Sequence, residues 1–182
     1  VVSAKLTLPN VINCRELFGD AGDTIYLTSV NLNLPKAINC NGLLDNCTAL
    51  TSVDLSLPSA TTCGGLLDNC TALTSVDLSL PSATNCMSLL YKCSGLTDVE
   101  LDLPSCEIAD SMCSKCTSLE NVTLNMPNLI TYDYIFQNCS NIETIDVTIP
   151  NDKVSGFKSY VLGLNLSNLT SFIINGGEVD LS

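Results

Sequence analysis

Apolar and polar residues alternate in a short motif that returns along the whole chain. The motif reads V-x-L-x-L, so every second residue is apolar, which is the period of a β-strand with one buried face. It predicts strands at residues 4–8, 30–34, 53–57, 76–80, 99–103, 122–126, 145–149 and 172–174. All but the last are followed directly by proline. Proline has no N–H to donate to a ladder, so we expect each of these strands to end there.

The spacing of the prolines also gives the length of the repeat. They lie 26 and then five times 23 residues apart, at Pro9, Pro35, Pro58, Pro81, Pro104, Pro127 and Pro150. Units of this length, each unable to bury its apolar side alone, are typical of solenoids. We therefore predict one solenoid domain over residues 1–182, with about seven to eight repeats.

The two ends of the chain depart from the repeat. Residues 1–8 fit only the back half of a unit, so we read them as a partial first repeat and expect the chain to belong to a longer solenoid. Residues 151–182 lose the proline and cysteine pattern, and we interpret them as an irregular C-terminal repeat or cap.

Between one strand and the next, the chain carries a C-x-x-L-L-x-x-C segment. Apolar residues three and four apart predict one or two turns of α or 3₁₀ helix. Stacked copies would then pair their strands in parallel, about 4.8 Å apart, and a right-handed crossover is the expected hand.

The L-x-x-V-x-L strand motif resembles the signature of leucine-rich repeats. The 23-residue period resembles the BspA-type subclass, which typically reads L-x-x-I-x-I-P-x-x-V-x-x-I-G-x-x-A-F-x-x-C. A paired apolar step three residues before a cysteine carries this resemblance, at Leu66 and Leu67, Leu89 and Leu90, and Ile135 and Phe136. The resemblance extends from Leu8 to Pro150. In two respects the chain departs from it: the proline falls two residues later, and Cys63 or Cys86 stands where Ile-Gly is expected.

This resemblance implies an α/β fold. The expected architecture is a right-handed leucine-rich-repeat solenoid with one parallel β-sheet on its concave face and short helical or 3₁₀ turns on its convex face.

Cysteine is the unusual component of the repeat. One column holds Cys47, Cys70, Cys93, Cys116 and Cys139, and a second holds Cys14, Cys40, Cys63 and Cys86. Column neighbours about 4.8 Å apart are too far for a disulfide, and bonds within a repeat would leave the column of Cys116 and Cys139 without partners. We expect reduced thiols packed in the core. The C-x-x-C of Cys113 and Cys116 lacks the second pair or the histidines that zinc requires.

Composition excludes several classes of function. Seven basic and nineteen acidic residues give a net charge of −12, which disfavours nucleic acid and anionic membranes as partners. No apolar stretch reaches the roughly 18 residues of a membrane-spanning segment. The chain has no histidine and none of the usual catalytic motifs, so we expect neither an enzyme nor a cofactor.

Three extra residues lengthen the first interval, in the Gly- and Asp-rich stretch from Phe18 to Tyr26. We interpret this stretch as a bulging loop. Its DAGD sequence lacks the spacing and the distal Glu of a calcium loop, so calcium is a minor hypothesis and no metal ligands are assigned.

Outward-facing strand residues form the most favourable surface for binding. They are short, polar and partly acidic, and the candidate ligand-binding residues are Asp54, Asp77, Asp98, Glu100, Asp102, Asn125 and Asp146. Two carboxylates about 4.8 Å apart repel by roughly 0.9 kcal/mol even in water. Either solvent and salt or a cationic partner must therefore reduce the repulsion along this column of carboxylates. The surface carries no Trp, Tyr or Arg, the usual hot-spot residues, and hydrophilic filler is the alternative interpretation.

Two functions follow from the resemblance and from the missing catalytic set. The first is a non-catalytic interaction or adhesion module of a bacterial cell-surface or secreted protein, with a host or bacterial surface protein as its partner. The alternative is a structural spacer, or a prophage tail-fibre segment, that has no ligand of its own.

Overall fold

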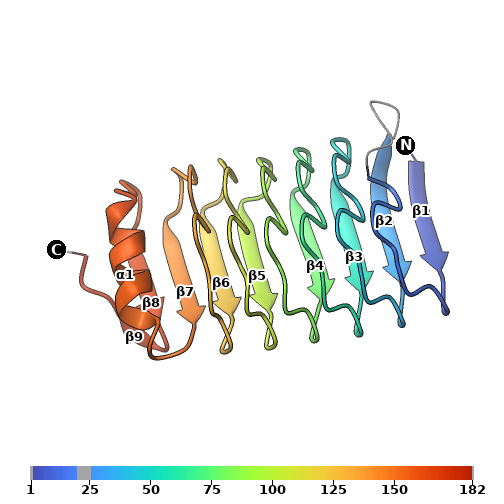
Figure 1. Cartoon of the computed structure of the whole chain (residues 1–182). Helices are drawn as coiled ribbons and strands as arrows, with labels where there is room; N and C mark the ends of the chain where they lie inside the picture. The colour runs from blue at the N-terminus through green and yellow to red at the C-terminus, as the bar shows by residue number, and fades with distance from the viewer. Residues whose placement is uncertain (1, 20–25, 182) are drawn as a thin grey trace.

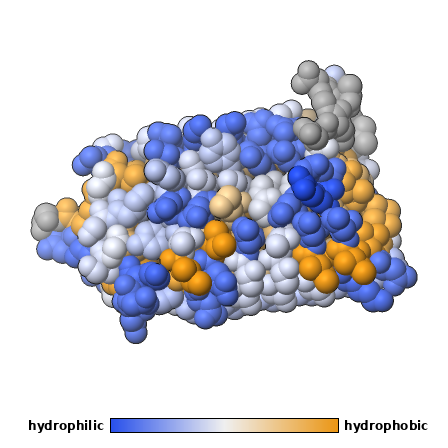
Figure 2. All heavy atoms as spheres, in the orientation of Figure 1, coloured by the Kyte–Doolittle hydropathy of each residue, from blue (hydrophilic) through white to orange (hydrophobic). Residues whose placement is uncertain are grey.

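A computed structural model describes residues 2–19 and 26–181 of the chain. Its strands stand side by side in one row, as Figure 1 shows. In the same orientation, hydrophilic and hydrophobic residues are intermixed on the surface (Figure 2). In order, the elements are β1 (Val2–Thr7), β2 (Leu27–Asn33), β3 (Ser52–Ser56), β4 (Ser75–Ser79), β5 (Asp98–Asp102), β6 (Asn121–Asn125), β7 (Thr144–Thr148), α1 (Val154–Gly163), β8 (Ser171–Ile174) and β9 (Gly177–Glu178). Strands β1 to β8 overlap the segments predicted from the alternating pattern, which is thereby confirmed.

The strands pair in the register that the repeat dictates. Neighbours run parallel, and each residue faces its equivalent one repeat later: Val53 pairs with Val76, and Leu124 with Val147. The molecule is therefore a parallel β-solenoid, as expected.

One expectation about the sheet is wrong. Instead of a single sheet, the strands form a four-stranded sheet, β1 to β4, and a five-stranded sheet, β5 to β9. The interruption lies between β4 and β5, and β9, which the alternating pattern did not predict, pairs antiparallel with β8.

The expected helical turns on the return side of each repeat are also wrong. Among the described residues the one helix is α1, outside the repeats. The return segments are instead built of β-turns, such as those closed by Leu43 N–H to Cys40 O (3.2 Å) and Cys47 N–H to Leu44 O (3.3 Å). A residue with positive φ, Gly42 or Asn46, stands third in each of these two turns, and such a residue breaks a right-handed helix.

Positive φ recurs at the same two positions of successive repeats. The first position is Gly42, Gly65, Ser88, Ser111 and Tyr134, and the second is Asn46, Asn69, Lys92, Lys115 and Asn138. Between turns, alternate N–H groups donate to the next repeat, as in Gly42 to Gly64 O (2.9 Å) and Leu44 to Leu66 O (2.9 Å). A row of single parallel bridges continues this ladder through Asn13, Asn39, Thr62, Asn85, Ile108 and Thr131.

The first of these positions yields a stability prediction. Gly65 has φ of 62° and Ser88 has φ of 55° at equivalent places. A Cβ on Gly65 would meet only Asp68 Cβ, at an ordinary 3.8 Å, so backbone conformation alone sets the effect. We expect Gly65→Ala to lower the free energy of unfolding by about 1 kcal/mol and Ser88→Gly to raise it by about 0.5 kcal/mol. Urea denaturation measures both, and a stabilising Gly65→Ala would contradict the turn assignment.

Thiols line the interior as the sequence predicts. All eleven cysteines are free and buried. In one column, four thiols donate to a carbonyl 26 residues earlier: Cys70 Sγ to Leu44 O at 3.2 Å, Cys93 Sγ to Leu67 O at 3.1 Å, Cys116 Sγ to Leu90 O at 3.1 Å, and Cys139 Sγ to Cys113 O at 2.9 Å. Each bond gives a buried thiol an acceptor and ties one repeat to the one before it.

The buried thiols predict instability in alkali. Burial raises the pKa of Cys47 to about 11 and the pKa of Cys40, Cys63 and Cys139 to about 12, against 9.0 for a free thiol. Because these pKa values are higher in the folded state, their contribution to stability is complete below pH 9.0 and is lost as the pH rises toward 12. The urea midpoint should fall across that interval. A urea midpoint that stays constant between pH 9.0 and 12 would refute the burial of these groups.

Aromatic side chains pack at the C-terminal end of the stack. Phe157 of α1 is fully buried, with its ring centroid 5.1 Å from that of Tyr132 and 6.4 Å from that of Phe172. The Tyr160 hydroxyl accepts the Phe136 N–H at 3.2 Å. Helix α1 is thus fixed to the preceding repeat and to β8.

Candidate binding face

The strand face is the set of outward-pointing side chains on β2 to β7. Exposed and buried residues alternate along these strands, as on β3 and β5, because odd and even side chains point to opposite sides. The sequence-predicted candidates all lie on this face. All are exposed except Asn125, which is half-buried.

The register brings some of these candidates together and separates others. Asp54 and Asp77 are direct neighbours on β3 and β4. Thr123 of β6 stands between Glu100 of β5 and Asp146 of β7. Asp98 and Asp102 lie beside Glu100 on β5, so this strand presents three carboxylates in line.

Asparagine amides donate hydrogen bonds to the two carboxylates that flank Glu100 on β5. Asn121 Nδ2 donates to Asp98 Oδ1 at 2.8 Å, and Asn125 Nδ2 donates to Asp102 Oδ1 at 2.7 Å. Each donor comes from the neighbouring repeat and orients the carboxylate it contacts. The sequence did not single out these amide–carboxylate pairs, although their 23-residue spacing was a usable signal.

The contacts of Asp98 favour its ionised form. Hydrogen bonds from the Thr97 hydroxyl and then from the Asn121 amide lower the pKa of Asp98 below its ordinary value. A third amide, of Asn31, donates to Asp54 Oδ2 at 2.5 Å. Strands β2 to β7 carry no Lys or Arg, so the strand face presents oriented negative charge with no cation of its own.

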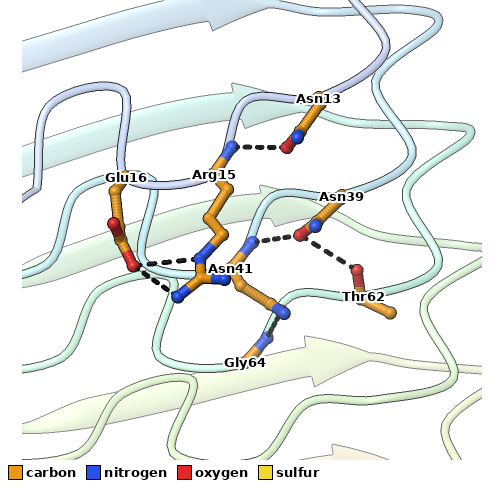
Figure 3. Close-up of polar contacts among 7 residues, drawn as sticks. All are labelled: Asn13, Arg15, Glu16, Asn39, Asn41, Thr62 and Gly64. Carbon is orange, nitrogen blue, oxygen red and sulfur yellow. Dashed lines mark hydrogen bonds and ion pairs between the residues drawn. The ribbon is translucent and has the colours of Figure 1, made fainter.

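A groove on the return side was not predicted from the sequence. Its volume is about 450 Å³ and its walls include Glu16, Asp45, Gly65 and Asp68. Figure 3 shows the polar contacts at one end, where Arg15 Nη2 lies 2.9 Å from Glu16 Oε1. The 23-residue spacing of Asp45 and Asp68 was the signal that could have found it.

Half-burial perturbs the carboxyl group of Asp68 in this groove. Desolvation, and then the negative charge of Asp45, raise the pKa of Asp68 to about 6, against the smaller opposing effect of Lys92 and Lys115. The side chains of those two lysines lie over the Tyr91 ring, at 5.0 and 5.1 Å from its centroid.

The described residues offer no metal centre. Within residues 2–19 and 26–181, no three His, Cys, Asp or Glu side chains are grouped so that they could hold an ion. The DAGD segment of the calcium hypothesis falls on residues 20–25, outside the described residues. No helix of the described chain is both long and apolar enough to cross a bilayer.

Parallel stacking of units with leucine-lined strands defines a leucine-rich-repeat solenoid. A family model described as the BspA type leucine rich repeat region matches in 6 copies, over residues 23–143 and 89–178. The chain therefore belongs to the BspA-type leucine-rich-repeat family. Comparison with curated proteins and with solved structures gives no match.

Proposed function

We propose that this chain is a non-catalytic interaction module whose strand face binds a cationic protein partner, in the setting of a cell-surface or secreted adhesion protein of a bacterium. The family is in general a protein-binding fold without catalysis, and it is commonly surface-associated. The observation that supports the proposal best is the set of carboxylates fixed by Asn amides on strands without basic residues.

Charge complementarity favours a partner with clustered Lys or Arg. Such a partner would relieve repulsion along the column of Asp54 and Asp77 and would form charge-assisted hydrogen bonds. Since the side chains are short and the face is flat, contacts would spread over several strands. We propose a host or bacterial surface protein as this partner.

The decisive experiment compares two triple variants on an array of surface proteins and glycans. The strand-face variant carries Asp77→Asn, Glu100→Gln and Asp146→Asn. The control removes the same charge elsewhere through Glu107→Gln, Glu120→Gln and Asp133→Asn, all exposed and off β2 to β7. We expect the wild type to bind a basic protein, the strand-face variant to lose at least about tenfold in affinity, and the control to lose less than about threefold.

A structural spacer, such as a prophage tail-fibre segment, is the competing function. The nearly identical repeats and the small polar side chains of β3 and β4 favour it. An array without any bound protein supports the spacer, and equal losses in both triple variants would mean that the strand face is not the binding surface.

A further inference from the structure

The strand side of the stack is interrupted at one place only among the described repeats. Every other pair of neighbouring strands from β1 to β8 forms a parallel ladder, whereas β4 and β5 form none. Figure 1 shows the wider separation of these two strands.

Backbone hydrogen bonds that link other pairs of neighbouring repeats are missing at both ends of the β4–β5 pair. Leu57 N–H donates to Ser79 O at 3.1 Å, but Leu80, one repeat later, makes no such bond to Asp102 among the described contacts. Thr74 N–H donates to Thr51 O at 3.1 Å, and Thr97 has no equivalent bond to Thr74 in the described chain.

A side chain changes partner at the same place. The Thr74 hydroxyl donates back to the Thr51 carbonyl of the preceding repeat, at 3.2 Å. The Thr97 hydroxyl donates instead to Asp98 of its own repeat, at 2.6 Å. Both the backbone and the side-chain links between repeats are thus released on the strand side.

The return side is continuous across the same joint. Asn85 and Ile108 form a parallel bridge, and Cys86 N–H donates to Ile108 O at 2.8 Å. Further along, Leu90 N–H donates to Met112 O, also at 2.8 Å. The two parts of the stack are therefore attached along one side and released along the other, which is the arrangement of a hinge.

The core is looser on the released side. Val76 and Leu78 of β4 are half-buried, whereas their equivalents on β5 are 2% and 3% exposed. Half-buried apolar residues and unmade ladder bonds are the features of a segment that opens at low cost.

Gly95 explains why the interruption lies here. An added Cβ on Gly95 would lie 2.8 Å from Leu73 O and 2.9 Å from Thr71 O, closer than real Cβ atoms approach. The equivalent residues of other repeats carry a Cβ, as Ala49, Ala72, Ser118 and Asn141 do. Glycine thus lets the loop before β5 press against the loop before β4, and a repeat that approaches its neighbour at one point tilts away from it at another.

We propose that the solenoid consists of two stacks that bend relative to each other between β4 and β5, and that Gly95 sets this hinge. Bending alters the spacing between Asp77 and Glu100, which flank the interruption on the strand face. The hinge is independent of the proposed function, since it rests on contacts between repeats and not on the charge of the strand face.

Amide hydrogen exchange of the wild-type protein, followed by NMR, tests the hinge. The matched pairs are Thr97 against Thr74 and Leu80 against Leu57, each pair being equivalent residues of successive repeats. We expect the amides of Thr97 and Leu80 to exchange at least about tenfold faster than their counterparts. Rates equal within about twofold would overturn the hinge.

A variant tests the role of Gly95. Gly95→Ala should push the two loops apart and let the strands pair, so that exchange of Thr97 and Leu80 slows toward the rates of Thr74 and Leu57. Ser118→Ala changes the equivalent residue of an intact joint without adding a Cβ and should leave all four rates unchanged. A folded Gly95→Ala protein with unchanged exchange would refute the role of Gly95. The wild-type comparison stands even where the variant does not fold.

Discussion

Replacing Phe157 by alanine should lower the free energy of unfolding by about 3–5 kcal/mol. The side chain is fully buried and contacts the rings of Tyr132, Phe136 and Phe172, so its removal leaves a cavity between α1 and the last repeats. Urea denaturation gives the magnitude. Because contacts in a solenoid are between neighbours, hydrogen exchange should accelerate first in α1 and β8.

Tyr160→Phe is the matched control for this prediction. It keeps the ring and removes the hydroxyl that accepts the Phe136 N–H, so a loss of only about 1 kcal/mol is expected. If Phe157→Ala cost no more than Tyr160→Phe, the aromatic cluster would not be the element that holds the C-terminal end.

Leu67→Ala should cost about 3 kcal/mol. Leu67 is completely buried in the middle of the stack, and its backbone bonds to the next repeat, with its N–H to Leu89 O at 3.0 Å and its carbonyl accepting Cys93 Sγ at 3.1 Å. The cavity left by this substitution would lie between two repeats, where no flexible surface segment could collapse to fill it.

The same chemical change at an exposed leucine provides the control. Leu162 of α1 is 39% exposed, and Leu162→Ala should change the free energy of unfolding by less than about 0.5 kcal/mol. Equal effects at the two leucines, measured by urea denaturation, would mean that Leu67 does not pack between repeats.

The strands and their register were predictable because two signals agree. Alternation fixes which side chains of a strand point inward, and the 23-residue period fixes which residues of the next strand they meet. Together they predict that Asp54 lies beside Asp77, and the same 23-residue spacing brings Asn121 to Asp98.

The helical turns predicted for the return segments are wrong because apolar spacing alone does not separate a helix from a series of β-turns. The three- and four-residue spacing around Leu43 and Leu44 fits both. What separates them is the residue type at the positive-φ positions: Gly42 and Asn46 tolerate a left-handed backbone, and neither favours a helix interior.

Two further features depend on contacts that no repeat pattern contains. Helix α1 lies where the repeated proline and cysteine positions end. The role of Phe157 in packing depends on its contacts with Tyr132 and Phe172, which the repeat pattern does not predict. The interruption of the sheet depends on a single missing Cβ at Gly95 and on how closely one loop approaches another.

In-register parallel stacking is the claim on which the fold, the strand face and the hinge all depend. Nuclear Overhauser contacts between methyl groups of β6 and β7 test it most directly, because the residue types there differ from strand to strand. Parallel stacking predicts contacts from Val122 to Ile145 and from Leu124 to Val147. Contacts from Val122 to Val147 and from Leu124 to Ile145, the antiparallel arrangement, would contradict it.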